Sequence, residues 1–318
     1  MIITDYLRSE SSLQWQYAKQ AGVNHAVIRL PEDDGFDCTN PSHWQTVYQR
    51  FMSAGLTPVV IEPMPNALHD HIKIGDEERD ACIEKVIRML PIMDSLNIRT
   101  ICLNFMAHIG WCRTSRDLPE RGGALVTGFD MEEFVPAEGD PAITEEELWT
   151  NLAYFLRAVV PYAEKHNIRL ALHPDDPPVP RLGRVSRILT SYENIHRAVH
   201  LVESDHLGVT LCQGTYTAMG ENLEQVIPAF ARENKIFFIH FRDIRGNKYK
   251  FRETFHDNGQ TDMARIIRLY QEYGCQVPIR VDHVPTMAGE ENEIPGYATV
   301  GRLYAIGYLK GILDGLQA

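Results

Sequence analysis

The chain has 318 residues, of which 44% are hydrophobic and 23% charged, the ordinary balance of a globular protein. Its formal charge of -12 argues against a nucleic-acid partner, because phosphate binding requires clustered lysines and arginines. It shows neither a membrane-length apolar run nor a secretory signal, and its six cysteines lack paired spacing, so we expect a cytoplasmic protein with free thiols and no membrane contact.

Short β-branched runs alternate with segments of helical period along the whole chain. We expect strands at residues 1–6, 26–30, 58–61, 99–105, 168–173, 207–212, 236–242 and 277–282. We expect helices at residues 12–20, 40–55, 77–96, 144–166, 192–203, 223–234 and 263–273, and a last one from 297 or 298 to 315. Eight βα pairs predict a closed (β/α)8 TIM barrel, with a doubly wound open sheet as the alternative. No linker-like stretch divides the chain, so we expect a single domain over residues 1–318.

The segment 106–143, after the fourth expected strand, has no regular pattern. It contains Arg113, Arg116 and the run Arg121-Gly-Gly123 among several acids. A loop of this length is uncommon in a compact domain unless it is a lid or a binding segment. We therefore predict a long loop after strand four that acts as a lid.

Four residues of metal-ligand type end, or nearly end, the fifth to eighth expected strands: His173, Cys212, His240 and Asp282. Each alone has an ordinary interpretation: a hydrogen-bonded core histidine, a small buried thiol, or an aspartate that caps a helix. In a barrel, however, the carboxyl ends of all strands meet at one mouth. The coincidence in four successive βα units therefore predicts a metal site. By ligand type, zinc, manganese, iron and cobalt all fit, and softness alone favours zinc.

The last expected strand leads into a loop rich in chemistry. Arg280 and Asp282 are two residues apart and so share one side of an extended strand. His283 begins the turn beyond the strand, and the loop then carries Tyr297 back toward it. Beside the other three strand ends, Asp282 is interpreted as the fourth metal ligand rather than as a helix cap.

A series of short motifs follows along the chain, most densely from residue 168 onward: Asn104-Phe-Met106 with Trp111 and Arg113-Thr114, His173-Pro-Asp-Asp-Pro-Pro178, Cys212-Gln-Gly-Thr-Tyr216, Ile239-His-Phe-Arg242, Phe255-His256 with Asp262-Met263, Arg280-Val-Asp-His283, and Pro295-Gly-Tyr297 with Gly301-Arg302. In content and in order, these motifs resemble the mannonate dehydratases. The resemblance covers most of the chain.

The resemblance implies a metal-dependent barrel that dehydrates D-mannonate to 2-dehydro-3-deoxy-D-gluconate in hexuronate breakdown. It implies Mn²⁺ as the usual cofactor, with Fe²⁺, Zn²⁺ or Co²⁺ as alternatives, held by His173, Cys212, His240 and Asp282. It assigns His283 and Tyr297 to the catalytic machinery and Asn104 to substrate binding. We further expect a small sugar acid as the binding partner and a homo-oligomeric assembly.

The chemistry of these residue types agrees with dehydration. A weakly acidic proton must leave the carbon beside the carboxylate, and a coordinated cation stabilises the enolate-like charge that develops. His283 suits one proton-transfer role and Tyr297 the other, and the sequence does not decide which is the base. Candidates for the substrate carboxylate, which a guanidinium grips bidentately, are Arg113, Arg242 and Arg280, with structural ion pairs as the alternative for the last two.

The chain departs from the family pattern around the substrate rather than at the metal. Residues 29–35 lack the histidine pair often found after strand two, residues 215–220 contain no arginine, and His283 is followed by Val-Pro rather than Gly-His. The family's longer insertion before helix four is also shortened. These departures leave another aldonic acid as an alternative substrate. Further alternatives are a sugar isomerase or epimerase, disfavoured because those barrels use several carboxylate ligands, and a non-catalytic sugar-acid binding protein.

Overall fold

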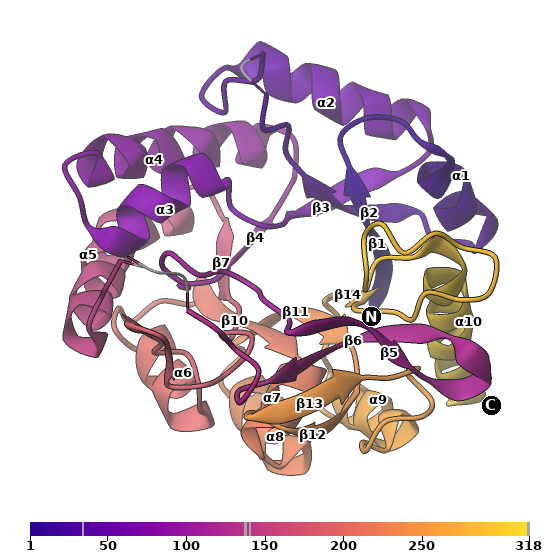
Figure 1. Cartoon of the computed structure of the whole chain (residues 1–318). Helices are drawn as coiled ribbons and strands as arrows, with labels where there is room; N and C mark the ends of the chain where they lie inside the picture. Colours follow the sequence, from indigo (N-terminus) through magenta and orange to yellow (C-terminus); the bar gives the residue numbers. More distant parts are fainter. Residues whose placement is uncertain (34, 137–138, 140, 317–318) are drawn as a thin grey trace.

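Eight parallel strands form a closed barrel in the computed structural model, which describes residues 1–318 except 34, 137–138, 140 and 317–318 (Figure 1). In chain order the barrel strands are β1 (Ile2–Arg8), β2 (His25–Arg29), β3 (Thr57–Ile61), β4 (Thr100–Leu103), β7 (Arg169–Leu172), β10 (Leu207–Cys212), β11 (Ile236–Phe241) and β14 (Pro278–Val281). Their order around the barrel is β1-β14-β11-β10-β7-β4-β3-β2. The predicted TIM barrel is confirmed.

Pairing between the first and last barrel strands closes the barrel. Ile2 lies opposite Pro278 and Thr4 opposite Arg280, in parallel register. This contact excludes the open sheet, which would leave β1 and β14 as separate edges. Strands β10 and β11 are buried at every position, as expected for strands covered on one face by helices and on the other by the barrel interior.

Helices surround the barrel on its outside (Figure 1). They are α1 (Leu13–Gln20), α2 (Pro41–Ser53), α3 (Asn66–Ile74), α4 (Arg79–Ser95), α5 (Glu145–Lys165), α6 (Tyr192–Val199), α7 (Gln213–Met219), α8 (Leu223–Arg232), α9 (Met263–Glu272) and α10 (Thr299–Gly315). The N-terminus of α5 carries a capping box in which the side chains of Thr144 and Glu147 each bond the other's backbone N–H. No helix in the described ranges is long and apolar enough to span a membrane.

The sequence interpretation missed two helices, α3 and α7. Helix α3 follows the loop after β3, and α7 begins at Gln213, directly after the barrel strand β10. Only seven residues long, α7 is too short to show a helical period, and two of its residues are Gly214 and Thr215. Its backbone nevertheless forms a helix because tertiary packing buries most of its side chains.

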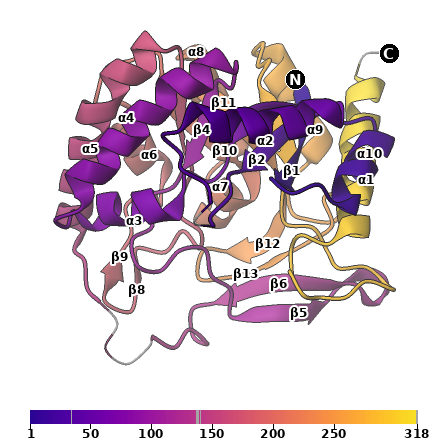
Figure 2. The same ribbon diagram turned by 90° about the horizontal axis from the view of Figure 1, so that it is seen from above.

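Part of the segment 106–143, predicted as a long loop that acts as a lid, forms sheet. Within it lie β5 (Ser115–Pro119), the short η1 (Arg121–Gly123) and β6 (Leu125–Asp130). Strand β6 pairs antiparallel with β13 (Lys250–Glu253), which pairs with β12 (Ile244–Asn247), so the sheet order is β12-β13-β6-β5. Figure 2 shows this sheet lying across one end of the barrel. It is the end where the strands finish, since β11 ends at Phe241 and β12 begins at Ile244. A second, two-stranded sheet joins β8 (Arg181–Leu182) to β9 (Val185–Ser186).

Candidate active site

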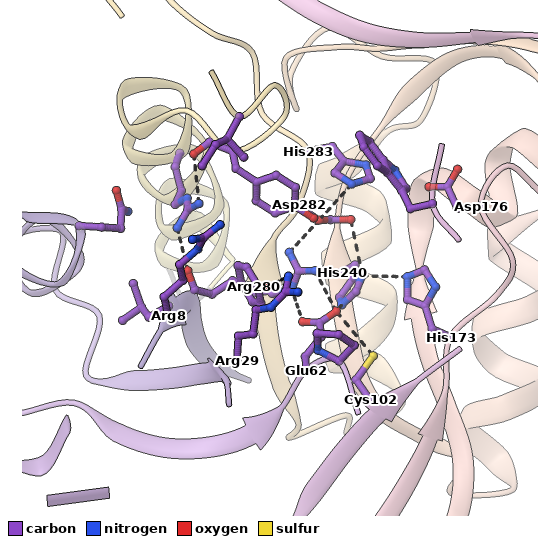
Figure 3. A pocket seen from close by; sticks show the side chains of 18 of the residues that line it. Arg8, Arg29, Glu62, Cys102, His173, Asp176, His240, Arg280, Asp282 and His283 are labelled. Atoms are coloured by element: carbon purple, nitrogen blue, oxygen red, sulfur yellow. Dashed lines mark hydrogen bonds and ion pairs between the residues drawn. The ribbon is translucent and has the colours of Figure 1, made fainter. Parts of the chain in front are cut away.

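Four donor atoms converge at the carboxyl ends of neighbouring barrel strands. His173 follows β7, Cys212 ends β10, His240 lies in β11 and Asp282 follows β14. The ligand atoms of His173, Cys212 and His240 all lie within 4.8 Å of one another. Asp282 Oδ2 is 3.6 Å from His240 Nδ1. The structure therefore brings together the four residues that the sequence predicted as metal ligands. Figure 3 shows three of them, His173, His240 and Asp282.

The two imidazoles of this cluster turn a nitrogen lone pair toward the same point. His173 Nδ1 lies 2.6 Å from the carbonyl oxygen of Pro174, and because a carbonyl only accepts, that nitrogen carries the hydrogen. Nε2 of His173 is then unprotonated, and it lies 3.1 Å from His240 Nδ1. Burial also lowers the pKa of His173, which favours the neutral ring. Two such nitrogens face each other comfortably only with a cation or a proton between them, so the donor set fits a borderline divalent metal.

Glu62, which follows β3, supports the cluster from behind. Its Oε1 lies 3.0 Å from His240 Nε2, and a carboxylate at that nitrogen leaves His240 Nδ1 as the ligand atom. Arg280 donates to both oxygens of Glu62 at 2.7 and 2.9 Å, and its third nitrogen donates to Asp282 Oδ1 at 2.7 Å. Burial alone would raise the pKa of Glu62, but Arg280 and His240 outweigh it and hold the pKa well below its usual range. Arg280 thus orients two of the four ligands: Asp282 directly, and His240 through Glu62.

A second charged network lies behind His283. Arg242 donates to both oxygens of Glu253 at 2.6 and 2.8 Å and to Asp176 at 2.8 Å. Arg113 donates to both oxygens of Asp176 at 2.7 and 2.9 Å and to Glu253 at 2.7 Å. All four side chains are at most 1% exposed. The network reaches the first cluster as well, because Arg242 Nη1 lies 3.4 Å from Cys212 Sγ.

His283 and Tyr297 lie side by side, as the returning loop suggested. Val284 N donates to Gly296 O at 2.8 Å, and this bond holds the end of the loop, beside Tyr297, against its beginning, beside His283. The rings of His283 and Tyr297 meet edge to face with centroids 5.6 Å apart. His283 adopts a φ of +45°, a left-handed conformation that is uncommon for residues other than glycine and concentrates at functional sites. Its Nδ1 lies 3.2 Å from Glu253 Oε1.

A cavity of about 680 Å³ opens over the metal cluster and His283. Its wall includes His173, His240 and Asp282 of the metal cluster, and the remaining predicted site residues that line it are Asn104, Arg280, His283 and Tyr297. Cys212 lies beneath the surface, fully buried. Arg113 and Arg242 do not line the cavity, and their guanidinium groups are occupied by the carboxylates of Asp176 and Glu253. Arg280 lines it, but its donors are used by Glu62 and Asp282.

Sequence reasoning missed three residues of this site. Glu62 ends an apolar run before Pro63, a signal similar to the one that identified Asp282, but no ligand motif accompanies it. Glu253 lies in β13, a strand that the sequence did not predict. Arg8, at the end of β1, lines the cavity, and among the described residues no carboxylate lies within ion-pair distance of its guanidinium. Its signal in the sequence is its place at the end of the first strand, the same kind of position as those of the predicted ligands.

Known proteins resemble this chain along its whole length. The D-mannonate dehydratase (UxuA) family model matches residues 1–140 and 137–318. A mannonate dehydratase of Streptococcus suis is 31% identical over 322 residues, covering 92% of this chain and 86% of that protein. One of Streptococcus agalactiae serotype Ia is 34% identical over 300 residues, covering 85% of each. The crystal structure of mannonate dehydratase from Streptococcus suis serotype 2 superposes with a TM-score of 0.90 at 26% identity, covering 99% of this chain and 93% of that one. The zinc-bound IOLI protein, at 14% identity and a TM-score of 0.61 over 99% of each chain, shares the fold.

Proposed function

The chain belongs to the mannonate dehydratase family, and we propose that it removes water from D-mannonate to form 2-dehydro-3-deoxy-D-gluconate. One observation carries the proposal: an imidazole and a phenol, His283 and Tyr297, line the same cavity as three of four converging metal-ligand residues. Dehydration of a sugar acid needs one group to take a proton and one to give it beside a bound cation. We keep the cytoplasmic location and the homo-oligomer as predictions.

We assign the metal to His173, Cys212, His240 and Asp282, with Mn²⁺ as the ion that the family implies. When bound there, a divalent cation would stabilise the negative charge that develops on the substrate as the proton leaves. The support for this assignment is the pair of lone-pair nitrogens 3.1 Å apart, with the Asp282 carboxylate 3.6 Å from one of them. Glu62 and Arg280 hold this arrangement in place.

We assign His283 as the base. The ionised Glu253 carboxylate lies 3.2 Å from His283 Nδ1 and favours the tautomer that carries its hydrogen there. Nε2, which lies 3.7 Å from Asp282 Oδ1, then carries the lone pair that accepts the proton on C2 of the substrate. Arg113 and Arg242 keep Glu253 ionised: burial alone would raise its pKa, but Arg242, His283 and Arg113 together lower it to about 2. These arginines thus act through Glu253 rather than on the substrate, which replaces their assignment to the substrate carboxylate.

We assign Tyr297 as the acid. Burial raises the pKa of Tyr297 well above its usual range, and the nearby Asp282 carboxylate raises it further, so the phenol keeps its proton. The electron pair left by the C2 proton forms the C2–C3 double bond, the C3–O bond breaks, and the departing hydroxide takes the phenol proton to leave as water. The resulting enol converts to the 2-keto product.

We propose that Arg8 and Asn104 contact the substrate itself. Both line the cavity, and the described structure gives the Arg8 guanidinium no carboxylate partner, in contrast to Arg280. A guanidinium in this position suits the substrate carboxylate. Asn104 Oδ1 already accepts a bond from Met106 N at 3.1 Å, which leaves its amide N–H groups for a sugar hydroxyl.

Incubation of the metal-loaded protein with a panel of aldonic acids tests the activity. We expect a 2-keto-3-deoxy product from D-mannonate. A product from a different aldonic acid alone would replace the substrate and keep the reaction. No such product from any acid, together with isomerisation of ketoses, would refute the dehydratase proposal.

Solvent deuterium exchange separates the two proton-transfer roles. We expect Tyr297→Phe to retain metal and to exchange the C2 proton of D-mannonate while turnover falls about 10²–10⁴-fold. His283→Asn should lose exchange and turnover together, because no base remains. The opposite pattern, with exchange in the His283 variant and none in the Tyr297 variant, would reverse the assignment.

A further inference from the structure

A second cluster of metal-ligand residues lies on the outer ring of helices. His196 and His200 are one turn apart at the end of α6, and Glu233 caps α8. His196 Nε2 lies 3.1 Å from Glu233 Oε1, and His200 Nε2 lies 3.1 Å from Glu233 Oε2. Roughly a third of each side chain is exposed, and none of them lines the catalytic cavity. The three ligand groups are thus gathered at a place that the reaction does not use.

The protonation of His200 follows from its other ring nitrogen. His200 Nδ1 lies 2.8 Å from the carbonyl oxygen of His196, so that nitrogen carries a hydrogen and donates it. In the neutral ring, Nε2 therefore points a lone pair at a carboxylate oxygen 3.1 Å away. That contact is repulsive unless a proton or a metal cation lies between the two atoms.

A proton between His200 and Glu233 would charge the His200 ring, because the other nitrogen of that ring already donates to the carbonyl oxygen of His196. The His196 ring, whose centroid lies 4.3 Å away, can instead meet Glu233 through the N–H of its neutral form. A single divalent cation would accept a lone pair from both rings and from the carboxylate at once, with neither ring positively charged.

We propose that His196, His200 and Glu233 form a surface site for a divalent transition-metal cation. Histidines four residues apart on one helical face are the spacing that metal-binding helices use. The three ligand atoms lie within 4.8 Å of one another, so small side-chain rotations would bring all three to the roughly 2.0–2.2 Å at which zinc binds imidazole and carboxylate ligands. Two imidazoles and one carboxylate favour Zn²⁺, Ni²⁺ or Cu²⁺ over Mg²⁺ or Mn²⁺, with water completing the coordination.

The surroundings hold the histidines for this role. The ring of His196 packs against those of Tyr192, at 5.6 Å, and Phe230, at 6.2 Å, the latter from α8. Figure 1 shows α6 and α8 on the outside of the barrel, and the ring of Tyr192 meets that of Phe230 at 5.2 Å. A cation bound here joins two successive βα units through their helices. It therefore binds the folded chain and not the unfolded one, which stabilises the fold in proportion to metal concentration.

Metal stoichiometry of the full-length protein tests the site. After dialysis against Zn²⁺, elemental analysis should find one equivalent more in the wild type than in His196→Gln/His200→Gln. Cys212→Ser, which alters the catalytic cluster, should keep the surface equivalent, so the result does not depend on the proposed reaction. His206→Gln, a surface histidine that pairs with Asn167, should match the wild type. Equal zinc content in the wild type and the double variant would overturn the proposal.

Two further measurements locate the cation. Crystals of the zinc-loaded protein should show anomalous scattering between the three side chains, and a zinc-loaded crystal without that peak would also overturn the proposal. Ni²⁺ should raise the melting temperature of the wild type more than that of His196→Gln/His200→Gln. Circular dichroism should show that the two proteins are equally folded before Ni²⁺ is added. An equal rise would count against a cation that joins α6 to α8.

Discussion

His240 and His200 each place a ring nitrogen about 3 Å from a carboxylate oxygen, 3.0 Å from Glu62 in the barrel and 3.1 Å from Glu233 on the surface. In the barrel, both oxygens of Glu62 are held by Arg280, and all three side chains are buried. On the surface, the Glu233 side chain is 36% exposed, and the described residues give it no arginine or lysine partner. An imidazole and a carboxylate are thus held in place by a third side chain in the barrel, whereas the same two groups on the surface are exposed to water.

The difference shows what burial does to a charged pair. A buried charge has lost its water and is tolerated only because partners replace that water, so removing one partner leaves the other unpaired. An exposed charge recovers water when its partner is removed. We therefore expect single substitutions to have large effects in the barrel networks and small ones at the surface cluster, unless a metal is bound there.

Arg242→Met should show the largest effect on stability. The change removes one of the two guanidinium groups that the buried carboxylates of Glu253 and Asp176 share and leaves them with Arg113. We expect a loss of about 3–5 kcal/mol in the free energy of unfolding, measured by urea denaturation. Arg265→Met is the matched control, since Arg265 pairs with Glu224 and Glu272 on the surface. Equal losses of unfolding free energy in the two variants would contradict the expected difference between buried and exposed ion pairs.

The pH dependence of stability should identify Glu253 within that network. Its pKa is lowered to about 2 from an ordinary 4.5, against the effect of burial, by Arg242, His283 and Arg113. A lowered carboxyl pKa stabilises the fold above pH 4.5, and this contribution is lost as the pH falls toward 2. We expect the wild type to lose stability across that window more steeply than Glu253→Gln, by about 1.4 kcal/mol per pH unit.

The control for the pH experiment is an exposed acid. Glu84→Gln changes a carboxyl group on the surface of α4, and its profile should follow that of the wild type. Urea denaturation between pH 2 and 6 provides the comparison. Parallel profiles for the wild type and Glu253→Gln would show that Glu253 does not carry the charge that we assign to it.

The sequence predicts the strand ends of this site and not the support behind them. His173 and Asp282 each follow an apolar run, and the barrel brings all such ends to one mouth, so local pattern and fold class together identify them. Glu62 contacts His240 directly and is held by Arg280, which is 218 residues away, and Glu253 lies in a strand whose partner, β6, comes from the segment predicted as a loop. A contact between distant segments leaves no periodic signal in either one, which is why the sheet over the mouth and both carboxylates were missed.

Glu62→Gln tests whether that support matters to the metal. The amide keeps the size of the side chain but no longer provides the negative charge beside His240 Nε2 or a full partner for Arg280. We expect metal affinity to fall about 10–100-fold, measured by titration of the metal-free protein, while Cys212→Ser, which removes a donor, should lose more. Glu32→Gln, which alters the half-exposed pair with Arg29, should bind metal normally. Unchanged affinity in Glu62→Gln would remove Glu62 from the support of His240.

Glu233→Gln should show the smallest effect, and its size depends on metal. In metal-free protein the substitution breaks two contacts at 3.1 Å to half-exposed histidines, and water replaces the lost partner. We expect a change below about 1 kcal/mol in the free energy of unfolding. With Zn²⁺ present, the wild type should gain stability that the variant lacks, because the variant has one ligand fewer. Urea denaturation with and without Zn²⁺ measures both quantities. A large loss of unfolding free energy in the metal-free protein would mean that the surface cluster stabilises the fold as much as the buried pair does. Burial would then not explain the difference between the two regions.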